Sequence, residues 1–227
     1  SAMNHRGPNN SAIENNGLFT LGHTRLSIID LDNRADQPYS YKHLRLAYNG
    51  EIFNYLELRE ELIKAGYSFD TESDTEVIIK SFEHYGPSCV NRFNGMWSLI
   101  IADISTNSCF VSRDRFGQKP LFYHRSNTGC LYFASEIQGL LPFLKNSDPN
   151  MAAIKSFLQE GDFDCDGNTF FEGVYEFPAA HNAEFNCSKP EISSFERYWD
   201  YPNTAYSSSN LDFMELLENA VHLRLRT

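Results

Sequence analysis

The stretch Tyr48–Asn54, Tyr-Asn-Gly-Glu-Ile-Phe-Asn, stands where the character of the chain changes from strand to helix. The apolar run Leu46–Tyr48 leads into it, and apolar residues at helical spacing follow it. Asn-Gly is the strongest short signal for a hairpin turn, but a hairpin needs a second alternating strand directly afterwards. We therefore expect the chain to leave the strand and turn at Asn49-Gly50 before a helix, with a hairpin as the minor alternative.

A turn of this kind has a chemical use. The side-chain amide of Asn49 and the backbone N–H of Gly50 can converge on one oxygen and form an oxyanion hole. Glycine lets a substrate approach the backbone closely. Arg25, Glu51 and Asp74 add one cation and two carboxylates. An Arg fork binds an α-carboxylate and an acidic side chain binds an α-ammonium, so the set suits an amino acid with a reactive side-chain carbonyl.

Two of these charged residues also have a plainer interpretation. Arg25 could form a surface ion pair. Asp74 could complement the dipole of a helix that starts near Ser73, where Ser73 and Glu76 form the sequence pattern of a capping box. On either interpretation we expect the Asp74 carboxylate, at a helix start, to be both ordered and exposed.

Length and composition limit the possibilities. The 227 residues are 41% hydrophobic, enough for one large domain or one domain with an appendage. The net charge of −11 and the absence of a basic run argue against nucleic acid as a partner. No apolar run is long enough to cross a membrane. The five cysteines form no C-x-x-C pair and the seven histidines have no ligand spacing, so we expect free thiols, no metal site and a cytoplasmic protein.

Many short strands and two early helices favour a sheet-on-sheet core covered by helices. The expected strands are two between Leu18 and Asp30 around Gly22, then 45–48, 96–103, 109–113, 121–124, 130–134, 170–174 and 183–185. The expected helices are 54–65, 73–85, 151–159 and 211–226.

Six motifs appear along the chain in a specific order. They are His5–Pro8, Arg25–Ile28, Asn49–Asn54, Ser73–Glu76, Arg113–Gly117 with Lys119–Leu121, and Ala134–Glu136. In this order the chain closely resembles the glutaminase half of glutamine-hydrolysing asparagine synthetase, a class II glutamine amidotransferase of the Ntn-hydrolase type. The resemblance covers nearly the whole chain, and six motifs at compatible spacing leave little room for chance.

The resemblance implies an α+β fold, a four-layer αββα sandwich of two mainly antiparallel sheets. It assigns residues 1–189 to the amidotransferase domain, 190–209 to a linker and 210–227 to the first helix of a synthetase domain. In the family a Cys-Gly pair at the tip of the first strand precedes the His5–Pro8 motif. This sequence starts with Ser1-Ala2-Met3, so we expect an N-terminally incomplete domain without its first strand, its nucleophile and the ATP-using half.

The resemblance also assigns roles in the site. Asn49 and Gly50 become the oxyanion donors, Arg25 the partner of the α-carboxylate, and Glu51 and Asp74 the partners of the α-ammonium. The backbone carbonyls of Leu26 and Ile28 are expected to line the same pocket.

Three further positions have structural interpretations. Arg113-Asp114 is expected to supply an ion pair and a turn between strands, and His5-Arg6 to help shape the pocket. Ala180 stands where the family usually has Gly. If that turn needs a positive φ, alanine costs stability there.

For the intact protein the resemblance implies that an N-terminal Cys attacks the side-chain amide of glutamine, with its own α-amine as general base. Ammonia would then pass to a synthetase domain that uses ATP and Mg²⁺ to amidate aspartate, and this chain would need no cofactor. The expected partners are glutamine, that synthetase domain and a second copy in a homodimer. Two alternatives remain: a catalytically silent module that binds glutamine or a protein partner, and a serine hydrolase using Ser1, which lies very close to His5–Pro8.

Overall fold

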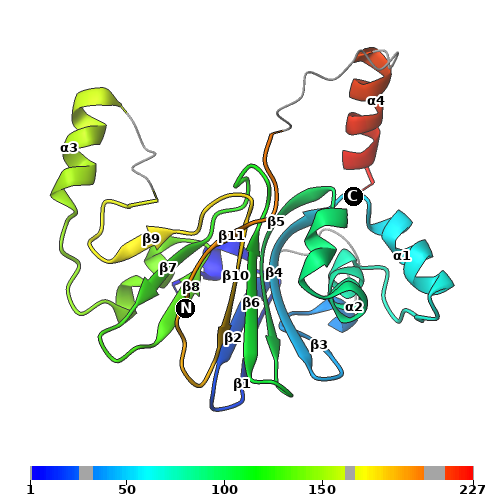
Figure 1. Ribbon diagram of the computed structural model, residues 1–227, viewed down its shortest axis with the longest axis horizontal. Coiled ribbons are helices and arrows are strands. Elements are labelled where there is room, and N and C mark those ends of the chain that lie inside the picture. Colours follow the sequence, from blue (N-terminus) through cyan, green and yellow to red (C-terminus); the bar gives the residue numbers. More distant parts are fainter. Residues whose placement is uncertain (1, 26–32, 162–166, 202–212, 227) are drawn as a thin grey trace.

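The computed structural model describes residues 2–25, 33–161, 167–201 and 213–226 of the chain. Its central element is a six-stranded antiparallel sheet with the strand order β11-β10-β6-β5-β4-β3 (Figure 1). The bounds of these strands are β3 Tyr39–Tyr41, β4 Leu44–Ile52, β5 Gly95–Asp103, β6 Ser108–Arg113, β10 His181–Asn186 and β11 Glu196–Arg197.

Two helices, α1 (Tyr55–Lys64) and α2 (Asp74–Tyr85), cover one face of this sheet (Figure 1). Along β4 the side chains of Leu44, Leu46 and Tyr48 are buried on that face, as the two-residue period of a strand requires. Burial of apolar surface, at about 25 cal/mol per Å², holds the helices against the sheet.

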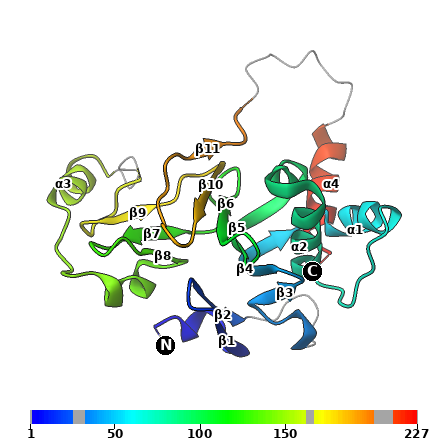
Figure 2. The same ribbon diagram turned by 60° about the horizontal axis from the view of Figure 1, so that its bottom comes forward.

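A second β layer lies on the other face of the six-stranded sheet (Figures 1 and 2). It contains a three-stranded sheet of β8 (Leu131–Ala134), β7 (Phe122–Arg125) and β9 (Val174–Glu176), and a hairpin of β1 (Asn10–Asn15) and β2 (Thr20–Arg25). Aromatic rings fill the space between the layers; Phe133 stacks on Phe185 of β10 with 5.9 Å between centroids. This sheet-on-sheet core with antiparallel pairing confirms the predicted α+β sandwich.

Two more helices lie away from this core (Figure 1). Helix α3 (Met151–Glu160) begins at the cap residue Asn150 and ends at Gly161, which has a left-handed φ of 72°. Helix α4 (Phe213–Arg224) has no buried residue. The described chain also contains short 3₁₀ segments at Asn4–Arg6, Asn33–Ala35, Gly86–Arg92, Ile137–Gly139 and Leu141–Phe143. The four predicted helices are thus confirmed, with shifts of one or two residues at their ends.

The expected turn at Asn49-Gly50 is wrong, as is the alternative hairpin. Both residues lie inside β4, opposite Ser98 and Trp97 of β5, and the strand continues to Ile52. A Cβ on Gly50 would lie 2.2 Å from the Met96 carbonyl oxygen, so glycine serves the close approach of two strands. The Asn-Gly pair, which usually signals a turn, here lies where two strands of a sheet approach each other closely.

Two further strand predictions are also wrong: the pair around Gly22 and the strand over 170–174. A single strand, β2, runs through Gly22, and its partner β1 precedes it in a polar stretch that shows no apolar alternation. The rest of the predicted pair, residues 26–30, lies outside the described residues. The strand expected over 170–174 instead begins at Val174, because Gly173 adopts a left-handed φ of 73° just before it.

The stretch expected to be a linker is attached to the domain over its described part. Strand β11 pairs with β10. The Tyr198 ring stacks on Trp97 at 6.1 Å, and its hydroxyl donates to the Arg113 carbonyl oxygen at 2.9 Å. Residues 202–209 lie outside the described residues.

Candidate active site

A cavity of about 640 Å³ opens between β4, the β1–β2 hairpin, the start of α2 and the end of β8. Its lining includes five predicted site residues, namely Arg25, Asn49, Gly50, Glu51 and Asp74. The prediction that these residues converge on one cleft is therefore confirmed, whereas their individual roles stay predictions. Leu26 and Ile28 lie outside the described residues.

The wall of the cavity contains an open strand edge. Strand β3 pairs with β4 only from Leu44 to Leu46, and among the described residues no strand continues along β4 beyond that point. Backbone groups of alternate residues in a strand point to the same side. Phe53 N–H donates to the Asn94 carbonyl oxygen on the β5 side. The backbone N–H and C=O groups therefore point to the open edge at Tyr48, Gly50 and Ile52.

Side chains take the place of the absent strand. Gln37 Oε1 accepts a hydrogen bond from Tyr48 N–H at 2.7 Å, and His23 Nε2 lies 3.1 Å from the Tyr48 carbonyl oxygen. Asp74 Oδ2 accepts from Ile52 N–H at 3.0 Å. No group in the described part of the chain accepts the N–H of Gly50, which lies between these clamped positions at the cavity. A backbone N–H held in this way can stabilise a developing oxyanion.

The side chain of Asn49 supplies a second donor. Its Nδ2 donates to Ser135 Oγ, just beyond β8, over a long 3.5 Å. Both residues line the cavity, so a ligand oxygen could replace this weak bond and accept from Asn49 and Gly50 together.

Two carboxylates lie beside the donor pair. Asp74, the first residue of α2, is only 5% exposed and accepts from the Tyr48 hydroxyl at 2.9 Å. Burial raises its pKa, against the lowering effect of its hydrogen bonds. The expectation of an exposed Asp74 is thus wrong, because the helix start is turned into the cavity wall. Burial, and then the charge of Asp74, also raise the pKa of Glu51, and a ligand ammonium between them would relieve this repulsion.

Arg25 stands at the end of β2 with 7% of its surface exposed. Its guanidinium forms an ion pair with Asp36 at 2.5 Å. The plainer interpretation of Arg25 is therefore partly correct, although Arg25 itself is buried and lines the cavity rather than the surface. A planar guanidinium has five donors, so pairing with Asp36 is compatible with contact to a second carboxylate.

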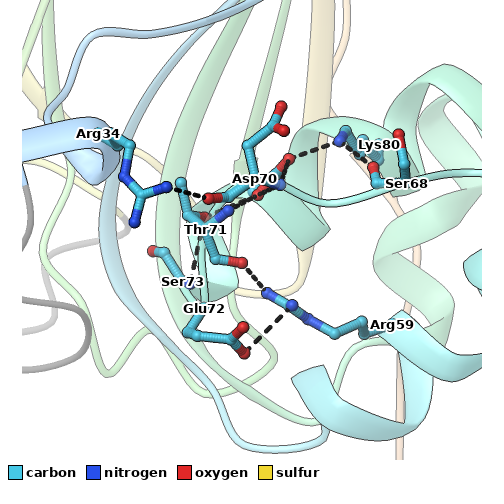
Figure 3. A network of polar contacts seen from close by, with 9 residues as sticks. Arg34, Arg59, Ser68, Asp70, Thr71, Glu72, Ser73 and Lys80 are labelled. Atoms are coloured by element: carbon cyan, nitrogen blue, oxygen red, sulfur yellow. Dashed lines mark hydrogen bonds and ion pairs between the residues drawn. The ribbon is translucent and has the colours of Figure 1, made fainter.

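A polar network fixes the segment that leads into Asp74 (Figure 3). Glu76 accepts from the backbone N–H groups of Asp70 and Thr71, and Lys80 Nζ binds Glu76 at 2.5 Å. Ser73 caps α2 through Thr75 N–H. The predicted capping box is therefore only half formed, because the Glu76 carboxylate is turned toward residues 70–71.

Arg113 and Asp114 organise a turn, as predicted. The Asp114 carboxylate accepts from four backbone N–H groups, those of Trp97, Phe116, Gln118 and Lys119. Arg113 donates to three carbonyl oxygens and its ion pair is with Glu176 at 2.7 Å. The turn brings Lys119 to the cavity.

The two outermost motifs meet each other in space. His5 Nε2 and Arg6 contact the Glu136 carboxylate at 3.0 and 2.7 Å. Arg6 also lines the cavity, which agrees with the predicted role of His5-Arg6 in shaping the pocket.

Sequence patterns did not indicate several lining residues. Gln37 and His23 belong to none of the six motifs. Their role depends on the open edge of β4, which exists only in the folded sheet. Among the described residues, no cluster of His, Cys, Asp and Glu could hold a metal ion, and no helix there is long and apolar enough to span a membrane.

Comparison with known proteins agrees with this geometry. The family model of the glutamine amidotransferase domain matches residues 1–199. A putative glutamine-hydrolysing asparagine synthetase 2 of Methanocaldococcus jannaschii is 33% identical over 253 aligned residues, covering 100% of this chain and 48% of that protein. Asparagine synthetase B of Escherichia coli is 34% identical over 161 residues, 70% of this chain and 29% of that protein. The chain therefore spans about half or less of the length of these relatives.

A solved structure shares the fold. Glutamine phosphoribosylpyrophosphate amidotransferase from Bacillus subtilis superposes with a TM-score of 0.54 at 21% identity, covering 79% of this chain and 35% of that one. This likeness supports the predicted Ntn-hydrolase type of sandwich. Because the family model matches most of its length, the chain belongs to the glutamine amidotransferase domain family.

Proposed function

We propose that the cavity binds glutamine and that Asn49 and Gly50 stabilise the oxyanion formed when its side-chain amide is cleaved to glutamate and ammonia. The observation that carries the proposal is the N–H of Gly50, which no group among the described residues accepts, at the open edge of β4 beside the Asn49 amide. Backbone and side-chain donors that are fixed before the reaction need no reorganisation during it.

The charges of the cavity suit the rest of glutamine. The α-carboxylate would contact Arg25, and the α-ammonium would lie between Glu51 and Asp74. The side-chain carbonyl oxygen would then accept from Asn49 Nδ2 and Gly50 N–H. The carbonyls of Leu26 and Ile28 would add acceptors for the ammonium.

The nucleophile in this proposal is an N-terminal Cys thiolate, which the resemblance implies and which the 227 residues do not include upstream of His5. Its sulfur forms a bond to the amide carbon and the carbonyl oxygen takes the negative charge. The α-amine, which has taken the proton of the thiol, passes it to the amide nitrogen as the C–N bond breaks, and ammonia leaves. Water then cleaves the thioester to give glutamate.

The direct test is a titration of this chain with glutamine, followed by NMR. We expect saturable binding that shifts the amide resonances of Asn49 and Gly50. Glu51→Gln should weaken it, since one of two charges facing the ammonium is lost, whereas the exposed control Glu184→Gln on β10 should not. In a protein that carries the upstream Cys, Asn49→Ala should lower turnover about 10²–10³-fold. A folded chain that shows no saturable glutamine binding would overturn the proposal.

We further infer that the ammonia serves a synthetase domain that amidates aspartate, as the names of the asparagine synthetase relatives suggest. In this proposal the synthetase domain uses ATP and Mg²⁺ and the protein is cytoplasmic. Helix α4 supports a partner of this kind. Its Phe213 and Leu217 are exposed, as is Leu225 just after the helix, while Arg226 binds Glu57 of α1 at 2.7 Å. A second copy of the chain is the competing occupant of this apolar face, and light scattering distinguishes the two because only the homodimer doubles the mass of the isolated chain.

A further inference from the structure

We propose that Gln37 and His23 are positioning residues, which hold the two peptide groups of Tyr48 so that the following residues, Asn49 and Gly50, keep the geometry of an oxyanion-binding pair. This inference rests on the proposed function. It assigns a task to two lining residues that have no charge to offer the ligand.

Tyr48 is held at three separate groups. Its N–H donates to Gln37 Oε1 at 2.7 Å, its carbonyl oxygen lies 3.1 Å from His23 Nε2, and its hydroxyl donates to Asp74 at 2.9 Å. These partners come from three parts of the fold: the segment before β3, strand β2 and the start of α2. The residue immediately before the donor pair is therefore fixed from three sides.

The clamp replaces the support that a neighbouring strand would give. A strand edge without a partner can twist and shift, because its backbone groups have no ladder to complete. The Gln37 side chain is 8% exposed and also lies 3.5 Å from Thr75 Oγ1 in the first turn of α2. It thus joins the edge of β4 to the helix that carries Asp74.

The hydrogen-bonding of His23 indicates its protonation pattern. A carbonyl oxygen can only accept, so Nε2 must carry the hydrogen. Burial lowers the pKa of His23, which favours the neutral ring and leaves Nδ1 as an acceptor. Nδ1 is buried without a partner in the described part of the structure. An unsatisfied buried group is destabilising, and proteins tend to retain such a defect where function requires the residue.

The experiment compares two ligands by NMR titration of the chain. Glutamine offers both α-groups and a side-chain carbonyl, whereas L-norvaline offers the α-groups and a side chain of similar length without the carbonyl. His23→Leu and Gln37→Met remove the two clamps. We expect each to weaken glutamine about three- to tenfold, the worth of one hydrogen bond, and to leave norvaline unchanged. His23→Gln retains an N–H donor and should bind glutamine as the wild type does.

The outcomes separate the hypotheses. Equal weakening of both ligands would mean general damage to the cavity and would overturn the positioning role, as would unchanged glutamine affinity. If the wild type bound neither ligand, the proposed function and this inference would fall together. A measurement on the wild type alone covers the case of unfolded variants. The Tyr48 amide must exchange slowly with solvent although no strand in the described part of the chain covers it, and rapid exchange would show that the Gln37 clamp is not formed.

Discussion

The two carboxylates at the cavity, Glu51 and Asp74, are the residues whose ionisation is most directly tied to ligand binding. Both have pKa values raised above their ordinary ones, mainly by burial. Their charged forms are therefore less favoured in the folded, empty protein than in the unfolded chain. Their contribution to stability is complete below the unfolded pKa and is lost as the pH rises through the raised folded pKa. A ligand ammonium acts in the opposite direction, because it stabilises the charged forms.

A pH dependence follows for glutamine. We expect its affinity to fall as the pH drops from neutral through the raised pKa values of Glu51 and Asp74, which lie above the ordinary 4.5 and 3.8. The increase in melting temperature caused by saturating glutamine should accordingly be larger at neutral pH than in mild acid. Glu51→Gln should flatten this profile and Glu184→Gln should not. A glutamine effect independent of pH in this range would remove the carboxylates from ammonium binding.

Ala180 adopts a backbone conformation that is unfavourable for alanine. Its φ is 60°, in the left-handed region, as was expected if the turn needs the glycine of the family. Its N–H donates to the Asp114 carbonyl oxygen and its own carbonyl accepts from Tyr198 N–H, so the surroundings hold it there. We expect Ala180→Gly to raise the free energy of unfolding by about 0.5–1 kcal/mol, since relief of the steric cost exceeds the added entropy of the unfolded chain.

Urea denaturation measures this difference, and the matched control is Ala183→Gly. Ala183 is equally buried and lies in β10, where glycine destabilises by about 0.5–1 kcal/mol. Should both variants lose stability alike, the backbone at position 180 would not be strained.

At the scale of the element, α2 is placed by an ion pair inside the protein. Glu76 and Lys80 are 0% and 3% exposed, and the ammonium lies over the rings of Phe69 and Tyr41 at 4.6 and 4.9 Å. Burial alone would raise the pKa of Glu76, but hydrogen bonds from Lys80 and Thr71 outweigh it and lower the pKa. The network fixes the segment before α2 and so determines where Asp74 enters the cavity.

Removal of the ammonium should leave Glu76 as an unpaired buried charge. We expect Lys80→Met to lower the free energy of unfolding by about 3–5 kcal/mol, and the double variant with Glu76→Gln to recover part of the loss. Lys64→Met, at the exposed end of α1, is the control and should change stability little. Chemical denaturation checks all three; a loss below about 1 kcal/mol for Lys80→Met would show that the pair is dispensable.

The elements differed in how well the sequence indicated them. The amphipathic helices and the strands β5 to β8 have strong periodic patterns and were predicted within about two residues. Strand β1 was missed because its polar sequence has no apolar alternation. Strand β4 was shortened because Asn49-Gly50 has the composition of a turn, while the reason for the glycine is the Met96 backbone, which is distant in sequence and contributes no local signal.

For the whole molecule, the ordered motifs predicted the layered α+β sandwich and the five residues that meet at the cavity. These residues converge because the two hydrophobic cores bring together the strand, the helix start and the hairpin end that carry them. The buried state of Asp74, the pairing of Arg25 with Asp36 and the clamps from Gln37 and His23 could not be predicted. These features depend on three-dimensional neighbours rather than on residue type or spacing.

The clamped edge of β4 also matters for how molecules of this protein meet one another. A long uncovered strand edge is a template on which strands of other molecules can add, leading to aggregation. Here Gln37, His23 and Asp74 occupy the groups on either side of Gly50. The gap that remains is one residue wide, which admits the carbonyl of a small molecule but gives a foreign strand nothing to extend along. The same arrangement that offers the Gly50 N–H to a ligand thus protects the sheet edge from pairing with strands of other molecules.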